Sequence, residues 1–146
     1  MRVSPLLLPV VVGLMGCGGS SAGGTDFPET GMRVTVETDR DVYAPGDTVF
    51  LDLRVVNPGA APATLRFASG QRYEFTILDA AGESVWTWSA DKGFIQALGD
   101  ERIEPGAMLT FREMFTGGLP PGRYAVRGLV PALDGVLADT TSIEVR

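Results

Sequence analysis

Hydrophobic and polar residues alternate with a period of two along most of the chain after Met32. Val34 and Val36 are separated by polar residues, and Leu51, Leu53 and Val55 follow the same pattern. Alternation of this kind predicts strands with one buried face, and no window of eleven residues carries a helical stripe. The segments predicted as strands are 34–36, 51–55, 65–67, 73–77, 85–88, 108–115, 123–130 and 141–145.

Turn-forming residues separate these strands at short intervals. They occur at 44–47, 57–59, 79–82, 104–106 and 119–122, and each of these segments contains proline, glycine or both. Short strands at this spacing predict an all-β protein, an immunoglobulin-like antiparallel β-sandwich of about eight strands. Tyr124 comes shortly after the Pro121-Gly122 turn, so its hydroxyl could bond to the backbone of that turn, as a tyrosine does at one corner of immunoglobulin-like domains. The alternative, with equal weight, is an ordinary core tyrosine.

The N-terminus has a different pattern. Arg2 precedes an almost unbroken apolar run that closes with Leu14-Met15-Gly16-Cys17, after which glycine and serine dominate. This pattern is typical of a lipoprotein export signal, and an ordinary signal peptide with an incidental cysteine is the alternative. We expect a signal peptide at 1–16, a flexible Gly/Ser tether at 17–31 and a β-sandwich domain at 32–146. Lipidated Cys17 would anchor the exported protein to a membrane of the bacterial cell envelope.

The composition of the chain argues against several classes of function. With 12 basic and 18 acidic residues the chain has a formal net charge of −6, which disfavours nucleic acid as a partner. Histidine is absent and the one cysteine is the predicted lipid anchor, so histidine-based catalysis and thiol chemistry are excluded. We therefore expect no enzyme activity and no cofactor.

Acidic residues gather in two turns. Asp39, Asp41 and Asp47 could supply oxygen ligands to calcium, but they lack the ordered spacing of a ligand loop. Solvated turn acids are the favoured interpretation, so no metal site is predicted.

The stretch 67–98 is the most distinctive part of the interior. Trp86 and Trp88 are two residues apart, so a strand would place both indoles on one face, either in the core or as an exposed platform for a partner. Beyond them, Ser89–Glu104 is the longest connection without clear alternation. Loops on a rigid scaffold often carry recognition, which makes Ser89–Asp100 the predicted binding loop.

At these residues the chain resembles a known family. The segments that carry the resemblance are FASGQRYEF at 67–75, DAAG at 79–82, VWTWS at 85–89, Phe94, QAL at 96–98 and PG at 105–106. Their order and spacing resemble the BsuPI family of bacterial intracellular proteinase inhibitors, over roughly residues 34–120. The resemblance implies an immunoglobulin-like sandwich that inhibits a serine protease. The predicted export signal is a departure from an intracellular inhibitor.

Two functional hypotheses follow. The first is a membrane-tethered inhibitor that occludes a serine protease with the Ser89–Asp100 loop, using Lys92, Phe94 or Ile95 in the specificity pocket. Phe94 and Ile95 could instead pack beneath the loop. The second is a non-inhibitory immunoglobulin-like module that binds another envelope protein or merely spaces one. Both require a protein partner.

Overall fold

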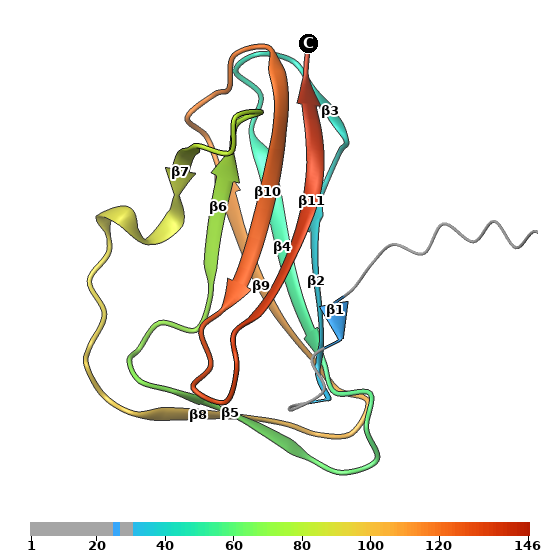
Figure 1. The fold of residues 1–146 in the computed structure, drawn as a ribbon, viewed down its shortest axis with the longest axis vertical. Helices are drawn as coiled ribbons and strands as arrows, with labels where there is room; N and C mark the ends of the chain where they lie inside the picture. The colour runs from blue at the N-terminus through green and yellow to red at the C-terminus, as the bar shows by residue number, and fades with distance from the viewer. Residues whose placement is uncertain (1–24, 27–30) are drawn as a thin grey trace, which may run out of the picture.

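The computed structural model describes residues 25–26 and 31–146, which form two main β-sheets and a small two-stranded sheet (Figure 1). One sheet has the order β1-β2-β4-β9, with β1 (Thr25–Asp26), β2 (Arg33–Thr38), β4 (Val49–Val56) and β9 (Met108–Phe115). The other has the order β3-β11-β10-β6-β7, with β3 (Val42–Tyr43), β11 (Leu137–Val145), β10 (Gly122–Val130), β6 (Glu74–Leu78) and β7 (Ser84–Thr87). The small sheet pairs β5 (Ala63–Phe67) with β8 (Gly99–Ile103). All pairings are antiparallel except the short parallel pairing of β3 with β11.

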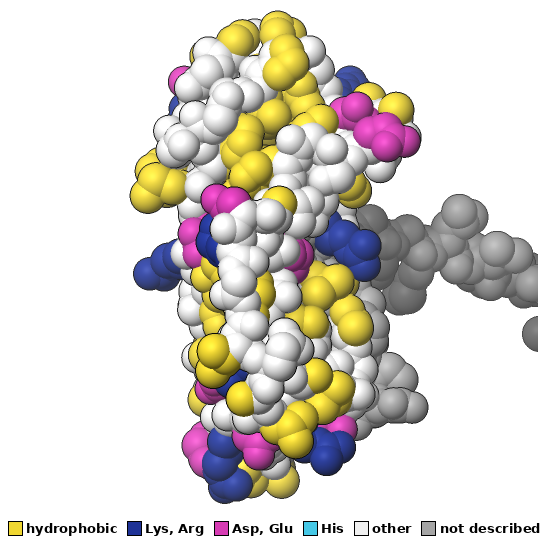
Figure 2. All heavy atoms as spheres, turned by 90° about the vertical axis from the view of Figure 1, so that its left-hand side faces the viewer, with side chains coloured by type: hydrophobic (Ala, Val, Ile, Leu, Met, Phe, Trp, Pro, Cys, Tyr) yellow, Lys and Arg dark blue, Asp and Glu magenta, His cyan; other side chains and the backbone are white. Residues whose placement is uncertain are grey.

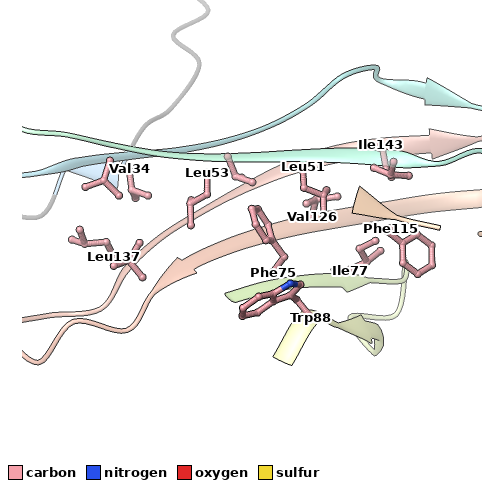
Figure 3. Close-up of a cluster of buried hydrophobic side chains, with 14 of the residues drawn as sticks. Val34, Leu51, Leu53, Phe75, Ile77, Trp88, Phe115, Val126, Leu137 and Ile143 are labelled. Atoms are coloured by element: carbon pink, nitrogen blue, oxygen red, sulfur yellow. The ribbon is translucent and has the colours of Figure 1, made fainter. Parts of the chain in front are cut away.

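The core lies between the two main sheets, and the period of two explains it. Alternate side chains of each strand point inward, and Figure 3 shows side chains of both sheets meeting in one layer. The fully buried members include Val34, Leu51, Leu53, Leu65, Phe67, Phe75, Ile77, Val126 and Leu137. Gly128 of β10 permits the close approach of the sheets, since a Cβ there would lie 2.7 Å from Cδ1 of Leu53.

The all-β, immunoglobulin-like architecture predicted from the sequence is confirmed, and so are several of its turns. Asp47 N donates to Ala44 O at 3.1 Å, and Ala107 N donates to Glu104 O at 3.0 Å. Each turn contains a glycine with positive φ, +87° at Gly46 and +73° at Gly106. A proline followed by such a glycine is the sequence that this kind of turn requires.

Tyr124 closes a corner of the sandwich. Its ring is buried, and its hydroxyl donates a hydrogen bond of 2.7 Å to the carbonyl of Pro120. The chain thus uses this tyrosine as immunoglobulin-like domains do, which decides between the two alternatives left open by the sequence.

Three strands of the structure lie outside the eight predicted segments: the two-residue strands β1 and β3, and the longer strand β8. The predicted connection Ser89–Glu104 ends in β8, which pairs with β5 from Ala63 opposite Ile103 to Phe67 opposite Gly99. Burial along β8 does alternate, with Asp100 and Arg102 exposed, but Ile103 is its only hydrophobic residue, and Gly99 and Glu101 occupy the half-buried positions. Hydrophobic alternation therefore could not reveal it.

The two tryptophans also differ from the prediction. β7 ends at Thr87, and Trp88 begins a short 3-10 helix, η1 (Trp88–Asp91), so the expectation that both indoles share one strand face is wrong. Of the two alternatives, core and exposed platform, the structure supports the core, fully for Trp88 and partly for Trp86. Trp88 is buried, and Trp86 packs on Phe115 with ring centroids 5.2 Å apart.

The predicted signal peptide, Cys17 and most of the predicted tether lie outside the described residues. Thr25 and Asp26 are described, and they pair with Val34 and Arg33 of β2. Among the described residues, no helix is long and apolar enough to cross a membrane, and η1 has only four residues.

Candidate functional site

The segment Lys92–Leu98, which we call the 92–98 loop, connects η1 to β8 along one side of the molecule (Figure 1). Ile95 and Leu98 are 75% and 81% exposed, more than any other large hydrophobic side chain of the described residues. Figure 2 shows this side of the molecule, with hydrophobic side chains exposed among polar ones. Exposed apolar residues on a loop are a common feature of surfaces that bind a partner.

The middle of the loop is held by its backbone. Gly70 N donates a hydrogen bond of 2.8 Å to the carbonyl of Ile95. A Cβ on Gly70 would lie 3.1 Å from Cγ1 and 3.6 Å from N of Ile95, so the absence of a side chain permits this close contact. The Ser69-Gly70-Gln71 turn is therefore the support on which Ile95 rests.

The three predicted contact residues have different environments. The Lys92 ammonium donates 3.0 Å bonds to Trp88 O and to Asp91 Oδ1, and it lies 4.7 Å from the Trp88 ring centroid. The hydrogen bond between Lys92 and Asp91 lowers the pKa of the Asp91 carboxyl group. Phe94 is partly buried against Trp88, with ring centroids 5.8 Å apart. Of the three, Ile95 alone extends an apolar side chain into solvent.

A row of aromatic rings connects the loop to the core. Trp88 packs on Tyr73 with centroids 4.4 Å apart, and Tyr73 stacks on Phe111 of β9 at 4.5 Å. The Tyr73 hydroxyl donates a 2.5 Å bond to Glu113, and burial together with this bond raises the pKa of Tyr73. Phe94 is the outermost ring of the row, so movement of the loop would disturb packing between the sheets.

Glu74 joins the Ser69-Gly70-Gln71 turn to η1, the helical turn that leads into the loop. Its carboxylate accepts 3.1 Å bonds from Gln71 Nε2 and Ser89 N, and a further bond from Ser89 Oγ. Next to it, Arg72 donates to Ser69 O at 2.7 Å and to Glu101 at 3.0 Å. Most of the residues that carried the family resemblance at 69–75 and 85–89 thus build the support of the loop.

Sequence reasoning missed the roles of Glu74 and Leu98. Glu74 and Ser89 are 15 residues apart in the sequence, so no local pattern predicts the hydrogen bond between them. In the sequence, both Glu74 and Leu98 stand out only as part of the family resemblance, because a single leucine in a connection without alternation carries no pattern of its own.

Asp39 and Asp47, two of the aspartates considered as calcium ligands, accept hydrogen bonds from groups of the protein itself. Asp39 accepts bonds from Tyr43 Oη at 2.7 Å, from Phe50 N at 3.0 Å and from Arg40 Nε at 3.1 Å. Burial opposes ionisation of Asp39, but these three bonds outweigh it and lower its pKa. Asp47 accepts from Ala44 N and Arg40 Nη1. These two carboxylates therefore organise the turn.

Known structures share the fold. Spo0M, a sporulation control protein from Bacillus subtilis, is 19% identical with a TM-score of 0.51, and the match covers 79% of this chain but 49% of Spo0M. The CARDB domain of the PF1109 protein from Pyrococcus furiosus is 13% identical with a TM-score of 0.51, covering 89% of this chain and all of that domain. At these identities the likeness concerns the fold alone. Among curated proteins no sequence match was found.

A family model gives the more specific result. The model of the BsuPI intracellular proteinase inhibitor matches residues 36–134. These residues include the 92–98 loop, the turn that supports it and the aromatic row beneath it. The match spans well over half of the chain, which therefore belongs to the BsuPI family of intracellular proteinase inhibitors.

Proposed function

We propose that this domain inhibits a serine protease by placing the 92–98 loop in the active-site cleft, and that it catalyses no reaction itself. Membership of a proteinase-inhibitor family supports inhibition as the general activity. The observation that carries the choice of loop is Ile95, whose backbone is fixed to Gly70 while its side chain is 75% exposed.

This combination suits inhibition for a thermodynamic reason. Ordering a flexible side chain on binding costs about 0.5–1.5 kcal/mol, so a loop that is already ordered retains more of its contact energy. The Gly70–Ile95 hydrogen bond, the Glu74–Ser89 contacts and the packing of Phe94 on Trp88 hold the loop before any partner arrives.

The proposal assigns the contact to Ile95 and Leu98. Lys92 would have to give up its bonds to Trp88 O and Asp91 before its ammonium could enter a pocket. Phe94 would have to leave Trp88. Ile95 and Leu98 need no such rearrangement, because both side chains already face solvent.

We further propose that the protein is exported and held at a membrane of the cell envelope through lipidated Cys17. The support is the Leu14-Met15-Gly16-Cys17 sequence after an apolar run. In cells fed a labelled fatty acid, the wild type should incorporate label and fractionate with membranes, and Cys17→Ser should do neither. A wild-type protein without label would contradict the anchor.

The test of inhibition is a titration of the purified protein against subtilisin-like, chymotrypsin-like and trypsin-like proteases. Stoichiometric loss of activity of at least one protease is expected. Ile95→Asp should weaken inhibition more than tenfold, about 1.4 kcal/mol, because a carboxylate replaces an apolar contact. Val136→Asp is the matched control, since Val136 is also exposed, at 48%, but belongs to the turn before β11.

Each outcome of this titration is informative. Equal inhibition by the wild type and the Ile95 variant would move the contact surface away from the loop. Rapid digestion of the domain, or no effect on any protease, would instead favour the non-inhibitory interaction module.

A further inference from the structure

Strand β9 forms an open edge of the four-stranded sheet. It runs for eight residues, Met108–Phe115, without an irregularity in its register with β4. Within the described residues, β4 is the only strand that pairs with it. Its outer row of backbone N–H and C=O groups is therefore available to another strand.

The other edges of the two main sheets are protected in ways that β9 is not. β7 has four residues and an irregular register beside Leu78, and β3 has only two residues. β2 is covered at one end by β1, and further along Val36 N donates a 2.9 Å bond to the Asp139 carboxylate. Short edge strands, bulges and capping carboxylates all prevent strand addition.

Hydrophobic side chains lie on the outer face beside this open edge. Met108 and Met114 of β9 are 56% and 57% exposed, and Phe50 of β4 is 49% exposed. Phe50 lies opposite Met114, and Val56 lies opposite Met108. Between these two apolar pairs, Arg112 lies opposite Asp52, with their side chains 3.3 Å apart.

We propose that β9 pairs antiparallel with β9 of a second copy of this chain, about a twofold axis at Phe111. In this register Met108 of one copy lies opposite Met114 of the other. The paired sheets then carry two continuous apolar rows, each formed by Phe50 and Met114 of one copy followed by Met108 and Val56 of the other. The exposed methionines are covered, and the two four-stranded sheets become one continuous sheet.

Charge and side-chain pairing favour this register over registers shifted along the strand. Residues that face each other are then Thr110 with Arg112 and Leu109 with Glu113, so no like charges meet. A shift that moves the axis to Arg112 would place two guanidinium groups opposite each other, which is destabilising. A shift that moves the axis to Thr110 would leave Met114 without a partner. Shifts of a single residue would turn inward-facing side chains outward.

The association state of the purified full chain tests the proposal, by sedimentation over a range of concentrations. We expect a monomer–dimer equilibrium that M108K and M114E each weaken at least tenfold, about 1.4 kcal/mol. The variant carrying both changes should recover affinity, because each new lysine then faces a new glutamate across the twofold axis. Leu133→Lys is the control, since Leu133 is also 56% exposed but lies outside the strand.

Hydrogen exchange provides a second readout that needs no variant. The outward-facing amides of β9 should gain protection as concentration rises. A wild type that stays monomeric up to about 1 mM, where association is worth only about 4 kcal/mol, would overturn the proposal. So would single variants that dimerise as the wild type does, or protection of β9 that is independent of concentration, which would indicate that another part of the same chain covers this edge.

Discussion

Two connecting regions of the molecule differ in what their side chains contact. One region consists of the turns at 39–47 and 117–124, and the other is the 92–98 loop. In the turns, which meet where Gly118 approaches Gly46, Asp39 and Asp47 bind donors nearby in the same turns, and Tyr124 binds Pro120. In the loop, the backbone and Phe94 are held from below while Ile95 and Leu98 project into solvent. The comparison indicates that the turns bind their own polar groups, whereas the loop leaves apolar surface exposed, which is why we propose it as the contact surface.

The largest effect is expected from Trp88→Ala, which breaks the support of the loop. Trp88 is buried and contacts both Tyr73 and Phe94, so truncation should lower the free energy of unfolding by about 3–5 kcal/mol. Denaturant unfolding measures the loss. A variant as stable as the wild type would show that the aromatic row contributes little to either the core or the loop.

Glu74→Gln should have a smaller and more local effect. The amide retains one acceptor oxygen but loses the charge that receives Ser89 and Gln71, a loss of about 1.5–3 kcal/mol. Hydrogen exchange should accelerate at 89–98 and stay unchanged at 39–47. Glu83→Gln, at an exposed position on the neighbouring turn, is the control and should leave both regions as they are.

Alkaline pH should disturb the turns before the loop. Burial and the hydrogen bond to Asp39 raise the pKa of Tyr43 to about 12, from an ordinary value of 10.0. The folded state therefore binds the phenolic proton more tightly than the unfolded state does. The corresponding stability is complete below pH 10 and is lost as pH rises toward 12.

We expect this loss to reach about 1–2 kcal/mol, since one unit of pKa corresponds to about 1.4 kcal/mol and the hydroxyl is not wholly shielded from solvent. Unfolding free energies measured across this pH range should fall less steeply in Tyr43→Phe than in the wild type. Equal slopes in the two proteins would assign the alkaline loss to other groups, of which Tyr73, whose pKa burial also raises, is the first to test.

The smallest effect is expected from Tyr124→Phe. Removing the hydroxyl deletes the bond to Pro120 O but keeps the buried ring, so about 0.5–1.5 kcal/mol should be lost. Protease inhibition should not change, because the corner lies in the turns rather than in the loop. A variant that kept its stability but lost inhibition would reverse the roles assigned to the two regions.

Much of the fold could be predicted because its causes are local. Val34, Leu53 and Ile143 alternate with polar neighbours since each strand of the sandwich has one buried face. Gly46 and Gly106 occur where the backbone needs positive φ, so the turns could also be located. β8 escaped prediction because its less exposed face carries Gly99 and Glu101 beside Ile103, so the sequence shows no hydrophobic alternation there.

The sequence by itself determined the sandwich, its turns and its family, since strand period, turn chemistry and motif spacing are all properties of short segments. The tyrosine corner at Tyr124 was left open by the sequence, and the hydrogen bond to Pro120 decided it. Only the tertiary structure decided that Lys92 is held by Trp88, that Phe94 packs inward and that Ile95 and Leu98 face solvent. It also decided that β9 is left at an open edge. The physical reason is that burial and pairing depend on residues far apart in the chain. Gly70 meets Ile95 and Glu74 meets Ser89 only after the sheets have packed, and those contacts choose which side chains remain free.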